Sequence, residues 1–249
     1  MKTDRSGQVV KQIDVGDHHG NLCFHNGQVY VAVNFGKFND AEGNADSWVF
    51  VYDAGNLALL AKHNTPEVIY GAGGIAYHDR RFVVVGGWPE KFKGNNAYEY
   101  DAEFKFVKLH RLKSLTTLMG IQTAAFADGH WWFGCYGDPK ILLKEDESFS
   151  ETGRRFEFDC SLRIVPIGGG KFLMQDQRRI DETPLVEGPH AGDVGRRRPE
   201  VVQHHRTQVV LGVQQDDTGS RNRSFAVRHC PSRCSTGCKV IGDGGLAAP

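Results

Sequence analysis

The residues best suited to chemistry are two adjacent histidines near the N-terminus. Asp17, His18 and His19 stand together in the segment Gly-Asp-His-His-Gly-Asn at 16–21. A carboxylate beside two imidazoles can bind a metal ion or supply an acid and a base near neutral pH. Neighbouring residues of an extended segment point to opposite sides, so both rings rarely reach one ion. The alternative interpretation is a solvated or hydrogen-bonded pair in a loop.

A polar segment at 39–46 places oxygen-bearing side chains at every second position. Its candidate metal ligands are Asp40, Glu42, Asn44 and Asp46. This spacing is reminiscent of a calcium-binding loop, but Ala45 stands where that loop needs glycine, and no glutamate follows at the required distance. Calcium or another divalent metal is therefore a weak candidate cofactor. A polar turn-forming loop is the stronger interpretation.

Candidate ligand-binding residues are aromatic side chains next to glycines, with one carboxylate. Trp88 and Glu90 lie in the segment Gly-Gly-Trp-Pro-Glu at 86–90, where the indole could stack on a sugar or another flat ligand. Tyr70 and Tyr136 are further candidates of this kind. Aromatic residues of flat, stacked sheets are more often core, which is the competing interpretation. The glycine-rich run 71–74 has no α/β context, so a nucleotide-binding fingerprint is not predicted.

The elements that must position these residues recur along the chain. Segments 24–33, 77–86 and 126–135 each read as a strand ending in an aromatic residue, a two-residue polar turn and a second strand. The turns are Asn-Gly, Asp-Arg and Asp-Gly, residues that tolerate the positive φ that a two-residue hairpin requires. A shorter fourth copy covers 167–173. We therefore predict four β-hairpins at regular spacing.

A second repeat is interleaved with the first. Strand-like segments that end in Asp53, Asp101 and Asp146 are each followed by a further segment, and these aspartates recur at intervals of 48 and 45 residues. Histidines also recur at matching positions of the repeats, His63 with His110 and His25 with His78. This recurrence indicates a structural role. Four short strands per period of this length is typical of a β-propeller blade.

The repeats predict an all-β fold, a β-propeller of four-stranded blades with about four blades visible. Three blades are whole; one outer strand at 9–15 precedes them, and two inner strands ending near Met174 follow. The first strand could complete the last blade and close the ring. Alternatively, the ring has five or more blades and is incomplete here, which would leave exposed strand edges.

This pattern resembles the broad group of NHL-like, YVTN-like and quinoprotein-like propellers. More loosely, it resembles uncharacterised propeller proteins of planctomycete-type bacteria. The resemblance rests on the blade period and on the Tyr-Asp turns at Tyr52-Asp53 and Tyr100-Asp101, and it covers roughly 8–175. It implies a fold that hosts ligand binding, scaffolding, lactone hydrolysis, lyase chemistry and quinone-dependent oxidation, so it does not choose a function.

Two parts of different composition are predicted, blades at 8–177 and an arginine-rich tail at 178–249. The tail has one aromatic residue, Phe225, and one lysine, Lys239. Three explanations stay open: a disordered extension, an out-of-frame translation of further blades, and a small module built on Cys230, Cys234 and Cys238. The cysteine spacing matches no common zinc or iron–sulfur pattern.

Composition excludes some partners. Lys plus Arg equals Asp plus Glu at 30 each, so no global field favours nucleic acid. No apolar run is long enough for a transmembrane helix. The first residues lack the apolar stretch of a signal peptide, which predicts a cytoplasmic protein as written, or a secreted or periplasmic one if an upstream leader has been lost.

A site is expected on one face of the propeller, where the long loops emerge. These are 34–47, 86–96 and 136–140, and 16–21, 65–74 and 113–122. Long loops on a rigid scaffold are where binding usually lies. The leading hypothesis is a binding platform for a protein or a small ligand. One alternative is a hydrolase or lyase acting on a sugar-like or lactone substrate, with His18 or His19 as base and Asp17, Asp40 or Glu90 assisting. Another is a truncated product without activity.

Overall fold

The computed structural model describes residues 1–4, 6–16, 18–114, 116–150, 153–168 and 171–175, together with 211–212 and 238–241. Within these residues the chain forms strands and turns and no helix. In the same part of the chain, nothing helical is long and apolar enough to cross a membrane. The predicted tail at 178–249 lies outside the described residues except for two short strands.

The described strands form three four-stranded antiparallel sheets and two three-stranded ones. The first four-stranded sheet consists of β3 (His19–His25), β4 (Gln28–Asn34), β5 (Ser47–Asp53) and β6 (Leu59–Asn64). The second consists of β7 (Ala72–His78), β8 (Arg81–Gly86), β9 (Asn95–Tyr100) and β10 (Phe106–Leu112). The third consists of β11 (Leu118–Ala127), β12 (His130–Tyr136), β13 (Ile141–Asp146) and β14 (Arg154–Glu157).

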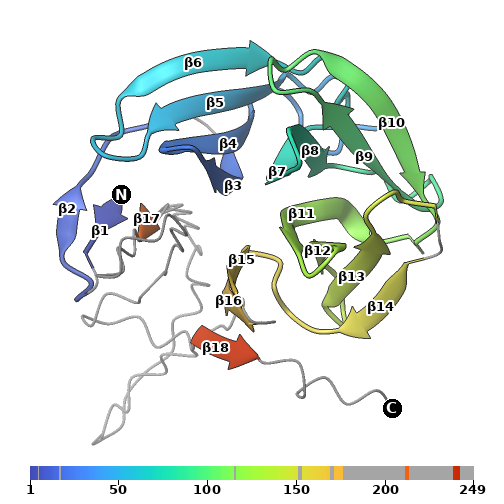
Figure 1. Ribbon diagram of the computed structural model, residues 1–249. Helices are drawn as coiled ribbons and strands as arrows, with labels where there is room; N and C mark the ends of the chain where they lie inside the picture. The colour runs from blue at the N-terminus through green and yellow to red at the C-terminus, as the bar shows by residue number, and fades with distance from the viewer. Residues whose placement is uncertain are drawn as a thin grey trace, which may run out of the picture.

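The sheets are arranged as the blades of a propeller (Figure 1). The inner strands β3, β7 and β11, with β15 (Arg163–Gly168), point toward the centre, and β6, β10 and β14 lie at the rim. β7 contacts both β3 and β11, and β11 contacts β15. The predicted all-β propeller of four-stranded blades is confirmed.

The inner hairpins have the predicted turn chemistry. Both residues of each turn have positive φ: 48° and 78° at Asn26-Gly27, 45° and 60° at Asp79-Arg80, and 51° and 72° at Asp128-Gly129. This is the type I′ conformation, whose twist matches that of the flanking strands. The fourth hairpin pairs Gly168 with Lys171.

The recurring aspartates organise the outer turns. Asp53 Oδ1 accepts the backbone N–H groups of Gly55 and Asn56, and Asp101 Oδ1 accepts those of Glu103 and Lys105. Asp146 Oδ1 likewise accepts the N–H groups of Ser148 and Ser150. The side chain thus closes an Asx-turn at the same place in every whole blade.

Each outer turn also contributes an apolar residue with positive φ, Leu57, Phe104 or Phe149. Phe104 of the second blade packs between blades: its ring lies 4.3 Å from that of His63 and 4.5 Å from that of Phe82. The first two blades share one core cluster, and the second and third share another. The blades are therefore held face to face by large side chains, as the repeat predicts.

The two ends of the described chain form the three-stranded sheets. β15 pairs with β16 (Lys171–Gln175), and β16 pairs with β18 (Cys238–Ile241). β2 (Val9–Lys11) pairs with β1 (Lys2–Thr3), which pairs with β17 (Leu211–Gly212). The N-terminal strand is thus shorter than the expected 9–15 and does not join the last inner strands, because β18 stands beside β16.

Candidate functional site

The long loops emerge at one end of the blades, since every blade is an antiparallel meander whose other end carries the tight turns. The candidate site is this end, which we call the loop face. Its described residues are 16, 18, 35–46, 65–71, 87–94, 113–114, 116–119 and 137–140.

The two histidines have different surroundings. His19 is buried; its Nδ1 lies 3.0 Å from the Gly16 carbonyl oxygen and its Nε2 lies 2.9 Å from the Tyr52 hydroxyl. A carbonyl can only accept, so Nδ1 carries the proton and Nε2 accepts from Tyr52 in the neutral ring. His18 is exposed and stacks on Phe38, with ring centroids 5.7 Å apart. The two rings do not converge on one point, and Asp17 lies outside the described residues.

The polar segment 39–46 forms hydrogen bonds within itself. Asp40 Oδ2 accepts the Asn44 side-chain amide at 2.7 Å, and Asp40 Oδ1 accepts the Glu42 N–H. The Asn44 hydrogen bond is the main reason that the pKa of Asp40 is lowered, with the Glu42 N–H adding to it. Asp46 instead accepts the Trp48 indole N–H at 2.6 Å. Within the described residues, no three His, Cys, Asp or Glu side chains are grouped to hold a metal ion.

Trp88 lies in an aromatic cluster with Tyr70. Its ring centroid is 5.3 Å from that of Tyr70 and 5.1 Å from that of Phe92, and the side chain is 7% exposed. The indole N–H is buried and has no hydrogen-bond partner in the described part of the chain. Glu90 is exposed beside this cluster. The structure therefore brings Tyr70, Trp88 and Glu90 onto the same part of the loop face.

Tyr136 stands apart from that cluster, at the end of β12. The Lys140 ammonium lies over its ring, 5.0 Å from the centroid. Desolvation raises the pKa of the Tyr136 hydroxyl, and the carboxylate of Asp159 contributes in the same direction. The phenol is thus neutral and suited to stacking or hydrogen bonding.

Below the loops, the inner strands approach one another through glycines. A side-chain carbon at Gly20 would overlap the Gly73 carbonyl, and one at Gly120 would overlap the Gly86 carbonyl. Asn21 of β3 reaches across and accepts the N–H of Ala124 in β11 at 3.1 Å. At Gly20 and Gly120 the backbones of neighbouring blades are thus too close for a side chain.

Exposed apolar residues form a feature that the sequence interpretation missed. Phe35, Ile69, Leu118 and Met119 are 40%, 42%, 44% and 37% exposed, and all lie on the loop face. Ile69 and Leu118 occupy equivalent positions, each two residues before a glycine with positive φ, Gly71 or Gly120. Alignment of the blade copies would have revealed this recurrence.

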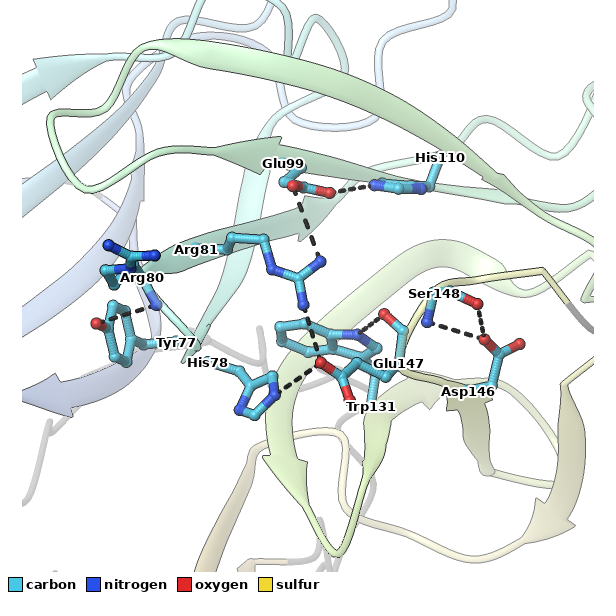
Figure 2. A network of polar contacts seen from close by, with 10 residues as sticks. All are labelled: Tyr77, His78, Arg80, Arg81, Glu99, His110, Trp131, Asp146, Glu147 and Ser148. Atoms are coloured by element: carbon cyan, nitrogen blue, oxygen red, sulfur yellow. Dashed lines mark hydrogen bonds and ion pairs between the residues drawn. The ribbon is translucent and has the colours of Figure 1, made fainter.

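The opposite face carries the polar network of Figure 2, between the second and third blades. His78 Nε2 and Arg81 Nη2 lie 3.0 and 3.1 Å from the same Glu147 oxygen. Arg81 also approaches Glu99, which lies 2.6 Å from His110 Nε2. His78 stacks on Phe126 of the next blade at 3.4 Å. Because His78 and Arg81 of the second blade both contact Glu147 of the third, the network joins these two blades.

The other recurring histidines have the same surroundings. His25 stacks on Tyr77 of the next blade at 3.7 Å, as His78 does on Phe126. His63 and His110 lie 4.3 and 4.4 Å from Phe104 and Phe149, again of the next blade. These histidines therefore pack between neighbouring blades, as expected for a structural role.

Comparison of the chain with models of known protein families and with curated proteins found no match. The assignment of a function therefore depends on the loop face itself.

Proposed function

We propose that this chain, like many of the propellers that its blade pattern resembles, is a binding platform, and that the loop face takes a protein segment through apolar contacts. The observation that carries the proposal is the exposure of Phe35, Ile69, Leu118 and Met119 at the same end of successive blades. Apolar side chains gathered on one surface are typical of interaction sites, and methionine adapts to varied partners.

The rigid blades support this role. The loops are anchored by strands whose cores are shared between neighbouring blades, so the exposed side chains are presented at fixed spacing. Equivalent residues of two blades, Ile69 and Leu118, can contact one extended partner at two points. Pre-organised contacts of this kind bind at a lower entropic cost.

The test compares two double variants. Peptides are selected from a random library on the wild-type protein, and their affinities are measured by fluorescence anisotropy. We expect Leu118→Ser with Met119→Ser to weaken binding about tenfold, because apolar area no longer buried contributes about 25 cal/mol per Å². Leu59→Ser with Leu60→Ser is the matched control, since these residues of β6 are 47% and 51% exposed at the rim.

The control is expected to bind the peptides as the wild type does. If both double variants bind equally well, or if selection enriches no peptide, the loop face is not the binding surface.

We further propose that residues 178–249 are an out-of-frame translation of DNA that encodes more blades. The support is the simultaneous loss of aromatic residues and lysine just after the inner pair β15–β16. Resequencing of the source DNA around codon 177 tests this. Aromatic-rich repeats in an adjacent frame would support the proposal, and their absence from both other frames would refute it.

A further inference from the structure

Two loops of the second and third blades lie side by side on the loop face. The Asn95 side-chain amide donates to Ser114 Oγ at 3.0 Å, and Thr117 Oγ1 donates to Asn95 Oδ1 at 2.9 Å. Thr116 Oγ1 donates to the Phe92 carbonyl at 3.4 Å. The last bond joins the loop 87–94 to Thr116, and the first two join Ser114 and Thr117 to Asn95, the first residue of β9, so the two loops are neighbours.

The start of β11 adds apolar groups to this surface. Met119 and Gly120 both have positive φ, 58° and 77°, and the pairing with β12 shifts register between Leu118 and Ile121. A non-glycine residue in this conformation is strained, and such strain together with a β-bulge is common at binding sites. The Met119 carbonyl is fixed by the Gln122 side-chain amide at 2.8 Å. Leu118 and Met119 are thereby held in solvent.

A third loop completes the surface. Leu118 stands opposite Tyr136 in the β11–β12 ladder, and the Lys140 ammonium lies over the Tyr136 ring. The loop 137–140 is therefore a neighbour of the exposed pair. We call the combined surface the basic corner: Lys91, Lys93, Lys113, Leu118, Met119 and Lys140.

The basic corner carries an excess of positive charge. Lys91, Lys93 and Lys113 are exposed, and none of them is in an ion pair with another described residue. In the three loops, two carboxylates, Glu90 and Asp138, stand against four lysines, and Asp159 near Tyr136 adds a third carboxylate. The neighbouring loop of the first blade has the opposite balance, Lys37 against Asp40, Glu42 and Asp46. The loop face is therefore polarised.

We infer that the basic corner binds an extended acidic peptide segment that also carries apolar side chains. Its carboxylates meet Lys91, Lys93 and Lys113, and its apolar residues cover Leu118 and Met119. The acidic loop of the first blade repels such a segment and so fixes it over the second and third blades, since complementary charge determines orientation and partner choice. This inference rests on the proposed function and names the partner class.

The experiment uses the full chain and a fluorescein-labelled peptide in which glutamates alternate with leucines and phenylalanines. Binding is followed by anisotropy. We expect Lys91→Glu with Lys93→Glu to weaken binding about tenfold, because two favourable rim contacts become repulsive. Lys105→Glu with Lys108→Glu is the matched control, because both lysines are exposed on the outer part of the second blade. It is expected to change binding less than twofold.

Salt and a neutral peptide separate this inference from the proposed function. Raising sodium chloride from about 0.1 M to about 1 M shortens the screening length from about 10 Å to about 3 Å and should weaken binding to the wild type. A peptide with glutamine in place of glutamate should bind more weakly. If the neutral peptide binds as tightly and still depends on Leu118 and Met119, the platform stands and the acidic partner is refuted.

Other outcomes also overturn the inference. Equal loss of affinity in the two lysine pairs would show that the overall charge matters and not the basic corner. A single-stranded oligonucleotide of the same charge that binds as tightly as the acidic peptide would show that apolar groups of the partner contribute nothing.

Discussion

Glu145 occupies the position in the third blade that a tyrosine holds in the first two, directly before the turn aspartate. Tyr52 is hydrogen-bonded to His19, and Tyr100 donates to Glu67 at 2.9 Å, so each tyrosine fixes the segment that enters its own blade. Glu145 is 1% exposed, and its Oε1 has no partner in the described residues. A carboxyl group in this position keeps its proton to a higher pH than an exposed one.

This position makes stability depend on pH. Burial raises the pKa of Glu145 from 4.5 to about 7, and the neighbouring Asp146 adds to the effect. Because the folded-state pKa is the higher one, stability from this group is present below about pH 4.5 and lost as the pH rises toward 7. The loss is on the order of 3 kcal/mol, at about 1.4 kcal/mol per pKa unit.

Glu145→Gln removes the ionisation, so we expect this variant to be the more stable protein at pH 8 and to lose less stability between pH 5 and pH 8. The free energy of unfolding in urea at both pH values measures the effect. Parallel changes in wild type and variant would show that Glu145 is not the group responsible.

At the scale of elements, the inner hairpin turns offer a test of backbone conformation alone. Gly129 has φ +72°, and a side-chain carbon there would meet nothing within 4 Å. Gly129→Val should therefore destabilise the protein by about 1–2 kcal/mol through the left-handed backbone, without a clash. Gly129→Asn, which tolerates this conformation better, should cost less than half as much. Thermal unfolding of both variants measures the two losses of stability. Equal losses would contradict the assignment of a left-handed conformation to this turn residue.

Blades and turns could be predicted from the sequence because their signals are local. The residue types of Asn26-Gly27 and Asp128-Gly129 predict hairpin turns. The spacing of the aspartates in the outer turns predicts the length of a blade. The surroundings of His19 and Trp88 could not be predicted from the sequence. His19 contacts Tyr52 and Trp88 contacts Tyr70, and in both pairs the two residues are far apart in the sequence. The pairing of β2 with β1 is local, but it was not predicted because β1 has only two residues and shows no strand pattern.

At the scale of the whole molecule, the blades differ in how firmly they are held. β8 is buried between two neighbouring blades, with Val84 and Val85 fully inaccessible, whereas all three residues of β2 are exposed. Amides of β8 should therefore exchange with deuterium only on global unfolding, and those of β2 by local opening. Native-state hydrogen exchange followed by mass spectrometry measures this difference. Similar protection of the two strands would mean that β2 is part of the same cooperative unit.

The bare backbone at Gly20, Gly86 and Gly120 has an evolutionary consequence. A side-chain carbon at Gly20 or Gly120 would overlap a carbonyl group of the neighbouring blade, and one at Gly86 would overlap the Gly71 carbonyl of its own blade, so none of these three positions can acquire a reactive side chain without a shift of the backbone. New binding specificities in proteins of this fold would therefore arise through changes in the length and composition of the loops. The inner strands that carry these loops would stay the same.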